Sequence, residues 1–147
     1  MKNSQLLGRF QLINDKIPVL LDVGHNPEAV KTLLDYLLMT FPGKRIRAVF
    51  SMMKDKDIAT VLEIMNPVVY DWFFVPLANP RAATETMMRD FFSRSSVNRV
   101  SFGYTGFTQA FNAAKNQAQQ DDLLLVFGSF FLISDCLNEF EKCELKK

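Results

Sequence analysis

The chain has 147 residues, of which 48% are hydrophobic and 22% are charged, and its formal net charge is +1 at pH 7. This length suits one domain with a sizeable core, and the nearly neutral charge without a basic run argues against a nucleic-acid partner. No apolar run reaches the roughly 18 residues of a membrane span, and residues 1–5 are not followed by the apolar segment of a signal peptide.

The first predicted elements are two strands joined by a tight turn. Residues 10–14 alternate in the manner of a strand, residues 14–15 suit a turn, and residues 17–23 would pair back as the second strand. A helix follows at once, because Asn26 is a good N-cap and Pro27 suits the first helical position. Its apolar residues recur at helical spacing and predict one buried face: Val30, Leu33, Leu34, Leu37, Leu38 and Phe41.

Strands and helices alternate through the rest of the chain. Strands are predicted over residues 45–50, 70–75, 97–102 and 123–127, and helices follow them near Ile58, after a Thr84 cap, and from Phe107 and Phe130. The last strand is a continuous apolar run, which suits a central parallel strand buried on both faces. In the last helix we expect four side chains to point inward: Phe130, Ile133, Leu137 and Phe140. The sequence therefore predicts an α/β fold, a Rossmann-like, mostly parallel sheet flanked by helices on both faces with an N-terminal antiparallel hairpin at its edge.

Polar residues stand at the ends of the second and the last strand, where open α/β sheets usually bind ligands. Asp22 could accept hydrogen bonds from a ribose, and the helix that begins after Asn26 favours negative charge at its start. Ser129, which follows a glycine, could offer its hydroxyl and nearby backbone N–H groups to an anion. His25 is the only histidine in the chain. On spacing alone, Asp22, His25 and Asn26 suit turn and cap geometry equally well.

The two cysteines, Cys136 and Cys143, do not suit a disulfide or a metal site. If both lie on one helix, seven residues separate them by roughly 10 Å along the axis, which is too far for an intramolecular disulfide. With one histidine and no Cys-x-x-Cys, the sequence offers no zinc cluster. We therefore expect a reduced, cytoplasmic protein without a metal site of its own.

Five short motifs follow one another along the chain: Gly8-Arg9, Asp22-Val23-Gly24-His25-Asn26-Pro27, Asp55-Lys56-Asp57, Pro80-Arg81-Ala82-Ala83 and Gly128-Ser129-Phe130. Together they resemble the C-terminal domain of folylpolyglutamate synthase and dihydrofolate synthase, a branch of the Mur ligase superfamily. The likeness covers the chain from Gly8 to about Phe140. Two positions depart from the family pattern, because Ser51 replaces a glycine ahead of the D-K-D motif and Phe131 replaces the histidine after the last motif. Any role of that histidine is therefore not carried over.

The resemblance implies an ATP-dependent ligase that adds L-glutamate to dihydropteroate, to folates or to both through an acyl phosphate. In this family an N-terminal domain holds the phosphate loop, the magnesium ligands and most of the folate site, and the C-terminal domain closes over it. The chain contains neither G-x-G-x-x-G nor a Walker loop, so we expect it to be inactive alone and to need that N-terminal domain as its partner. Residues 1–7 would be a linker remnant, 8–142 the domain and 143–147 a frayed tail. We expect the parent enzyme to be a monomer.

The resemblance also implies roles for single residues. Arg9 would reach the ATP phosphates, which suits its delocalised charge and donor fork, and Asp22 would take the ribose hydroxyls. Asn26 would contact the nucleotide as well. His25 would be the catalytic residue, lying where the triphosphate and the incoming glutamate meet. Ser129 would help to hold that glutamate.

Other interpretations of the same residues stay open. Arg81 would meet a substrate anion, although Arg81 and Arg9 taken alone also suit a solvated surface. The D-K-D motif at residues 55–57 is expected near the interdomain cleft without an assigned role, and a solvated helix cap is its alternative. Two other functions fit the fold: the C-terminal domain of a murein-type Mur ligase, and a non-enzymatic α/β binding module. The D-x-x-H-N-P and P-R-A-A motifs argue against the murein type.

Overall fold

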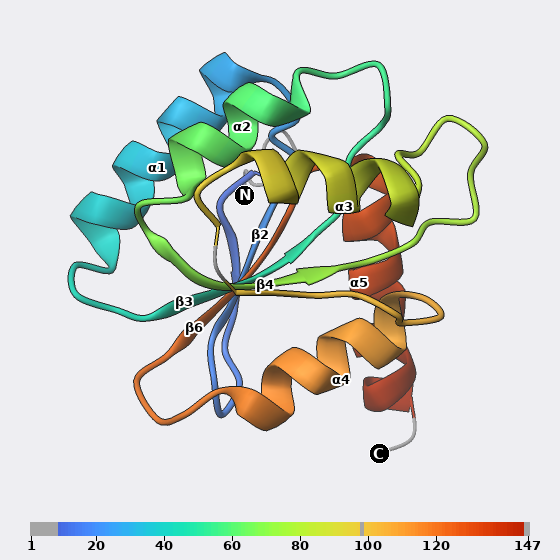
Figure 1. Ribbon diagram of the computed structural model, residues 1–147. Helices are drawn as coiled ribbons and strands as arrows, with labels where there is room; N and C mark the ends of the chain where they lie inside the picture. The colour runs from blue at the N-terminus through green and yellow to red at the C-terminus, as the bar shows by residue number, and fades with distance from the viewer. Residues whose placement is uncertain (1–8, 98, 146–147) are drawn as a thin grey trace.

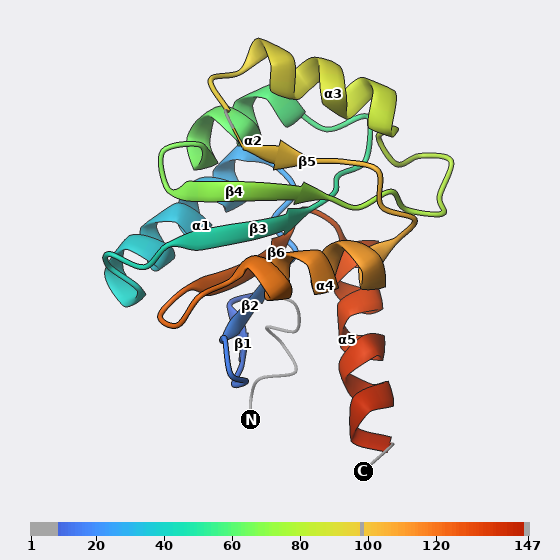
Figure 2. The same ribbon diagram turned by 60° about the horizontal axis from the view of Figure 1, so that its bottom comes forward.

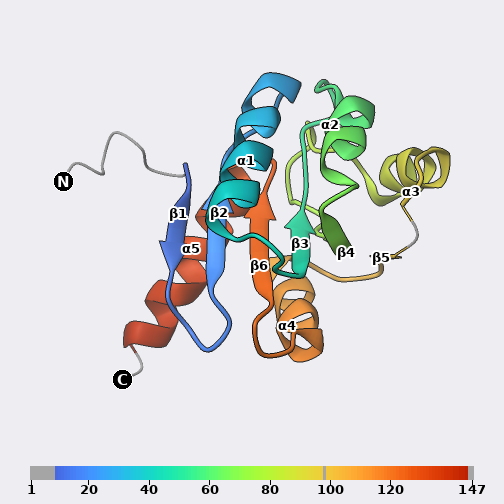
Figure 3. The same cartoon turned by 90° about the vertical axis from the view of Figure 1, so that its left-hand side faces the viewer.

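One six-stranded sheet organises the computed structural model, which describes residues 9–97 and 99–145, with side chains as far as residue 141. Its strands are β1 (Gln11–Ile13), β2 (Val19–Asp22), β3 (Ile46–Phe50), β4 (Val69–Phe74), β5 (Val100–Ser101) and β6 (Leu123–Phe127). They lie side by side in the order β1-β2-β6-β3-β4-β5, as Figure 3 shows for the first five of them. Strand β1 pairs antiparallel with β2 and every other pairing is parallel. The predicted parallel sheet with an antiparallel N-terminal hairpin is thus confirmed.

Helices cover both faces of the sheet. They are α1 (Pro27–Thr40), α2 (Ile58–Met65), α3 (Glu85–Arg94), α4 (Phe107–Gln117) and α5 (Phe130–Leu145). Helices α1, α2 and α3 pack on one face, and α4 and α5 pack on the other (Figures 1 and 2). In the part of the chain that the structure describes, no helix has both the length and the apolar character that crossing a membrane requires.

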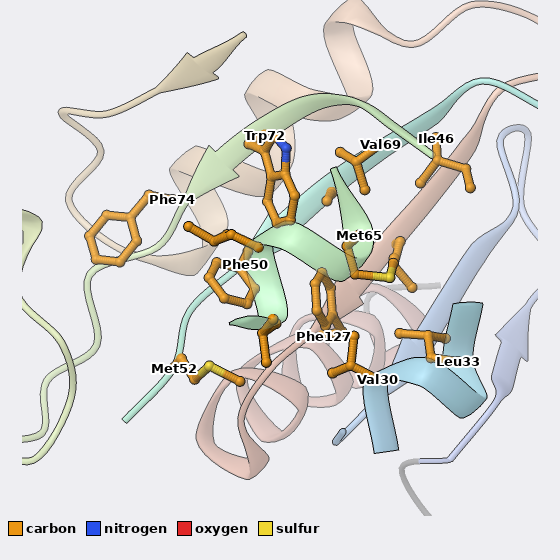
Figure 4. Packing of buried hydrophobic residues seen from close by; sticks show 14 of the residues in the cluster. Val30, Leu33, Ile46, Phe50, Met52, Met65, Val69, Trp72, Phe74 and Phe127 are labelled. Atoms are coloured by element: carbon orange, nitrogen blue, oxygen red, sulfur yellow. The ribbon is translucent and has the colours of Figure 1, made fainter. Parts of the chain in front are cut away.

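Each face of the sheet has its own core, and β6 contributes to both. Leu123, Leu125 and Phe127 point to the side of α1–α3, whereas Leu124 and Val126 point to the side of α4 and α5. The first core is rich in aromatic rings that contact one another (Figure 4), with Phe50 and Phe127 at a centroid distance of 4.8 Å and Phe50 and Trp72 at 5.3 Å. The expectation that β6 is a central strand buried on both faces is therefore confirmed.

A buried ion-pair network closes the amino end of the sheet. Arg47 on β3 donates from Nη1 to Asp71 Oδ2 on β4 at 2.8 Å and from Nε to Asp122 Oδ2 at 3.0 Å. Asp122 also accepts a hydrogen bond from the backbone N–H of Gln119 at 2.9 Å. Burial raises the pKa of Asp71, and the charge of Arg47 opposes that shift. Because each carboxylate has a partner, these charges can be accommodated away from water.

The helix starts follow the capping chemistry of the sequence. Asn26 Oδ1 accepts a hydrogen bond from Ala29 N at 2.8 Å, and Thr84 Oγ1 accepts one from Met87 N at 3.2 Å. These contacts satisfy backbone donors that have no partner within the first turn of a helix. The predicted N-caps of α1 and α3 are therefore confirmed.

Three expectations about single elements need correction. Strand β5 covers only Val100–Ser101, shorter than the predicted 97–102, of which residue 98 lies outside the described residues. Leu38 is 54% exposed, because it lies about 100° round the helix from the buried Leu37. Phe130 is 63% exposed and does not point inward, because the buried stripe of α5 begins at Leu132.

The last helix extends beyond residue 142, where the domain was predicted to end. Helix α5 continues to Leu145, so residues 143–145 are helical and 146–147 lie outside the described residues. The fraying of this tail stays a prediction. Cys136 is buried and unbonded, and its burial raises the pKa of its thiol to about 12. The side chain of Cys143 lies outside the described residues.

Candidate functional site

The carboxyl ends of β2, β6 and β3 meet at one edge of the sheet, because the three neighbouring strands are parallel. Helix α1 leaves β2 toward one face, and α5 leaves β6 toward the other. The chain therefore departs in opposite directions from two adjacent strands, which is the arrangement at which open α/β sheets form ligand crevices. The motifs that follow these strands lie at this edge.

A cavity of about 160 Å³ opens at this edge, and three of the predicted site residues, His25, Arg81 and Ser129, line it. Its other walls come from Lys56 and from four further residues: Met53, Gly128, Phe130 and Phe131. The lining residues come from four different strand-to-helix connections. The cavity is smaller than the roughly 300–1,000 Å³ of a typical small-molecule site. It therefore suits part of a ligand, or a ligand the size of an amino acid.

Gly128 allows β6 to turn tightly against the end of β3. Its φ is +116°, and a side-chain Cβ at this position would overlap the carbonyl oxygen of Ser51. A residue without a Cβ is thus required here on two counts. The turn positions Ser129, whose Oγ accepts a hydrogen bond from Phe131 N at 3.1 Å and caps α5. Ser129 therefore presents a helix start, with its unpaired N–H groups, to the cavity.

The loops after β3 and β4 are joined by a short antiparallel bridge between Met53 and Ala82. Beside this bridge, Lys54 N donates to the carbonyl oxygen of Arg81 at 2.8 Å. The D-K-D and P-R-A-A motifs consequently lie together, with Lys56 of the first and Arg81 of the second in the wall of the cavity. Two cationic side chains in a small cavity favour an anionic ligand.

His25 is half-buried in the turn between β2 and α1. Its Nδ1 lies 3.0 Å from the carbonyl oxygen of Val23. Because a carbonyl oxygen can only accept, a hydrogen bond here requires the proton on Nδ1, and the neutral tautomer with that proton leaves Nε2 as an acceptor. The arrangement gives the cavity a ring nitrogen that can accept a hydrogen bond or a proton.

Asp22 and Arg9 are paired with each other beside the cavity. The Asp22 carboxylate is fully buried, and its Oδ1 lies 2.6 Å from Arg9 Nε. The backbone N–H groups of Phe10 and Gly24 also donate to this carboxylate, at 3.3 and 3.1 Å. Burial raises the pKa of Asp22, and the nearby Arg9 guanidinium opposes that shift. Arg9 keeps 28% of its side chain exposed, so its outer edge can still meet a ligand.

The predicted site residues thus fall into three places. His25, Arg81 and Ser129 share the cavity, Arg9 and Asp22 form a pair next to it, and Asn26 is exposed at the start of α1. The sequence singled out the D-K-D motif but gave no role to Lys56. The position of this motif after a parallel strand is the feature that could have placed Lys56 at the cavity. The exposed rings of Phe130 and Phe131 at the cavity were missed, because helical spacing alone assigns the first to the core.

The described residues do not form a metal site. Among them, no three histidine, cysteine or acidic side chains lie close enough together to hold a metal ion.

Comparison with known sequences identifies a matching family model and relatives that share one name. A family model described as "Mur ligase, glutamate ligase domain" matches residues 8–130. Dihydrofolate synthase/folylpolyglutamate synthase of Escherichia coli (strain K12) is 34% identical over 129 residues, which are 88% of this chain and 29% of that protein. The protein of the same name from Bacillus subtilis (strain 168) is 27% identical over 128 residues, 87% of this chain and 29% of that protein.

Solved structures give the same relationship. E. coli FolC in complex with DHPP and ADP is similar with a TM-score of 0.83 at 31% identity, covering 93% of this chain and 32% of that chain. A bifunctional folylpolyglutamate synthase/dihydrofolate synthase with Mn, AMPPNP and L-glutamate bound has a TM-score of 0.79 at 31% identity, covering 91% of this chain and 31% of that one. The chain spans less than a third of each of these relatives. The chain belongs to the Mur ligase family, as a C-terminal domain of the folylpolyglutamate synthase and dihydrofolate synthase type.

Proposed function

We propose that the chain is the C-terminal half of the active site of an ATP-dependent ligase that adds L-glutamate to dihydropteroate, to folates or to both. The observation that carries this proposal is the cavity in which His25, Arg81 and Ser129 meet from three separate connections. Relatives that share the fold have been solved with ADP, and one with L-glutamate. Their names describe folate ligases, which supports this substrate class over the murein type.

The cavity suits glutamate better than a nucleotide. Its small volume and the two cations in its wall, Lys56 and Arg81, match a small ligand with carboxylates. Ser129 adds a hydroxyl and the start of α5. His25 would accept a proton or a hydrogen bond through Nε2, and the incoming amine of glutamate must lose a proton when it attacks an acyl carbon. These four side chains would therefore orient the amino acid and handle its proton.

The nucleotide would lie on the side of Arg9 and Asp22. The exposed edge of Arg9 can donate to phosphate oxygens, and its charge would add to a phosphate clamp. The Asp22 carboxylate is covered by Arg9, so we expect Arg9 to shift toward the phosphates before Asp22 meets ribose hydroxyls. Asn26, exposed at the start of α1, would lie beside the same ligand.

A domain that supplies only part of each ligand site must close over its partner to act. We infer that an N-terminal domain holds ATP and magnesium. The two domains together would form a cytoplasmic monomer. Closure would exclude the water that hydrolyses an acyl phosphate. It would also hold the amine of glutamate against the acyl carbon, and such orientation can lower a barrier by about 7–11 kcal/mol in favourable cases. By the same reasoning, the chain alone should not turn over substrate.

A chimera tests the proposal. Residues 8–147 would replace the homologous domain of the E. coli relative, and ADP release would be measured with dihydropteroate and L-glutamate. We expect glutamate-dependent ADP release from the chimera and none from this chain alone. Ser129→Ala should reduce turnover at least tenfold by loss of a hydrogen bond to substrate, whereas Ser93→Ala, on the exposed side of α3, should not. A folded chimera without glutamate-dependent turnover on dihydropteroate or folate would overturn the proposal.

A further inference from the structure

A second hollow lies at the opposite edge of the sheet, where β4 begins. It has a volume of about 250 Å³, and its walls include Asn66, Val69, Tyr70, Trp72, Ser96 and Arg99. Strands β3, β4 and β6 are parallel, so their amino ends form this edge and their carboxyl ends form the candidate ligase site. The hollow is therefore separate from that site, and none of the five sequence motifs reaches it.

Trp72 brings a hydrogen-bond donor without an acceptor to this hollow. Its side chain is only 1% exposed, and its ring packs against Phe50 and Phe92 at centroid distances of 5.3 and 5.4 Å. The indole Nε1 has no hydrogen-bond partner among the described residues. In Figure 4 this nitrogen lies on the side of the ring that faces Val69, another residue of the hollow. An unpaired buried donor costs about 1–3 kcal/mol, so an acceptor is expected here.

The hollow also carries positive charge that is not neutralised. The guanidinium carbon of Arg99 lies 4.4 Å from the Tyr70 ring centroid. Within the described residues, Arg99 makes no ion pair with a carboxylate. Asp71 is close enough for Arg99 to lower its pKa, but it is hydrogen-bonded by Arg47. A stacked guanidinium group with free donors favours an anion.

Ser96 adds a second donor with a defined direction. Its Oγ accepts a hydrogen bond from Asn66 Nδ2 at 2.6 Å. Because that bond uses a lone pair of the oxygen, the hydroxyl proton of Ser96 is available to another acceptor. Val69 supplies an apolar wall beside these donors. The hollow thus combines three kinds of donor with a surface that can contact carbon atoms.

We propose that this hollow binds a small organic carboxylate. The fork of Arg99 would hold the two carboxylate oxygens, the Trp72 N–H and the Ser96 hydroxyl would complete their hydrogen bonds, and Val69 would contact the organic part. A planar, singly charged group matches the arginine fork and the single unpaired cation of the wall better than a phosphate does. The site is independent of the ligase function proposed above, and it gives the Trp72 N–H its missing acceptor.

The test uses Trp72, which is the only tryptophan of the chain and therefore gives one indole N–H signal in an NMR spectrum. The 147-residue chain would be titrated with acetate and with L-glutamate, and with chloride and phosphate at matched ionic strength. We expect a saturable shift of the indole N–H resonance with the carboxylates. Arg99→Gln should weaken binding about tenfold or more, as loss of a charge-assisted hydrogen bond does. Arg89→Gln, which removes an exposed charge on α3, should leave it unchanged.

Several other results would overturn the proposal. A shift that does not saturate, or that chloride reproduces, means an adventitious ion only. Tighter saturation by phosphate contradicts the carboxylate assignment. Trp72→Phe keeps a ring in the core and removes the N–H, and calorimetry should then show acetate affinity reduced about tenfold. Unchanged affinity in that variant, or in Arg99→Gln, would remove the hollow as the binding site.

Discussion

Arg9 Nε lies 2.6 Å from Oδ1 of Asp22, so the first motif of the chain is bound to the last residue of β2. The next residue, Phe10, has a φ of +48° and stacks on Tyr36 of α1 at a ring-centroid distance of 4.4 Å. The backbone entering the domain is thereby held on both sides. The two residues assigned to the nucleotide therefore neutralise each other in this conformation, and a nucleotide would have to compete with the pair.

The first prediction concerns the pH dependence of this pair. Burial raises the pKa of Asp22 above its ordinary value of 3.8, so the folded state takes up a proton at Asp22 before the unfolded state does. The contribution of Asp22 to the free energy of unfolding should therefore increase as the pH falls toward 3.8, and decrease as the pH rises. We expect wild type to gain stability relative to Asp22→Asn between about pH 7 and about pH 4. Urea unfolding of both chains across this range measures the difference, and a relative loss would contradict the assignment.

The second prediction concerns the turn at the candidate site. Gly128→Ala should lower the free energy of unfolding by about 3 kcal/mol or more, because the new Cβ meets Ser51 and the positive φ is strained. Gly43→Ala is the matched control, since Gly43 has a φ of +76° but no atom within 4 Å of the added Cβ. That control should cost only about 1–2 kcal/mol. Equal losses in urea unfolding would show that the contact with Ser51 is unimportant.

The third prediction concerns the charges buried at the amino end of the sheet. Arg47→Met leaves Asp71 and Asp122 without their cation, and should cost about 3–5 kcal/mol. Lys44→Met is the control, because its ion pair with Asp121 is long, at 4.0 Å, and largely exposed, and should contribute about 0–1 kcal/mol. Chemical denaturation at neutral pH compares the two. A loss in Arg47→Met as small as in the control would mean that the aspartates find other partners.

Periodicity predicted the elements well where burial on one or two faces decides the pattern. Strand β6, an unbroken apolar run, lies at the centre of the sheet, and α1 buries Val30, Leu33 and Leu37. The same reasoning failed for Phe130, because whether the first turn of a helix is covered depends on where the neighbouring strand ends. Helical spacing contains no information on that point.

Part of the candidate site could be predicted from the sequence. His25, Arg81 and Ser129 each follow the carboxyl end of a parallel strand, and such ends share one edge, so their meeting could be predicted, whereas their roles came from the family resemblance. The partners of Arg47 could not be predicted, since they lie 24 and 75 residues away and depend on strand register. The burial of Asp22 under Arg9 could not be predicted either, because it depends on the path of the backbone that leads into β1.

The last prediction separates two roles of Asn26. Its side chain caps α1, so Asn26→Ala should lose about 1 kcal/mol, whereas Asn26→Ser should keep most of the stability because serine caps equally well. If the amide also contacts the nucleotide, the serine variant of the chimera should show a KM for ATP raised severalfold although its domain is stable. Thr84→Ala removes the cap of α3 at a similar cost and should leave that KM unchanged. Wild-type ATP kinetics in Asn26→Ser would reduce Asn26 to a helix cap, and the contribution of this domain to the nucleotide site would then come from Arg9 and Asp22.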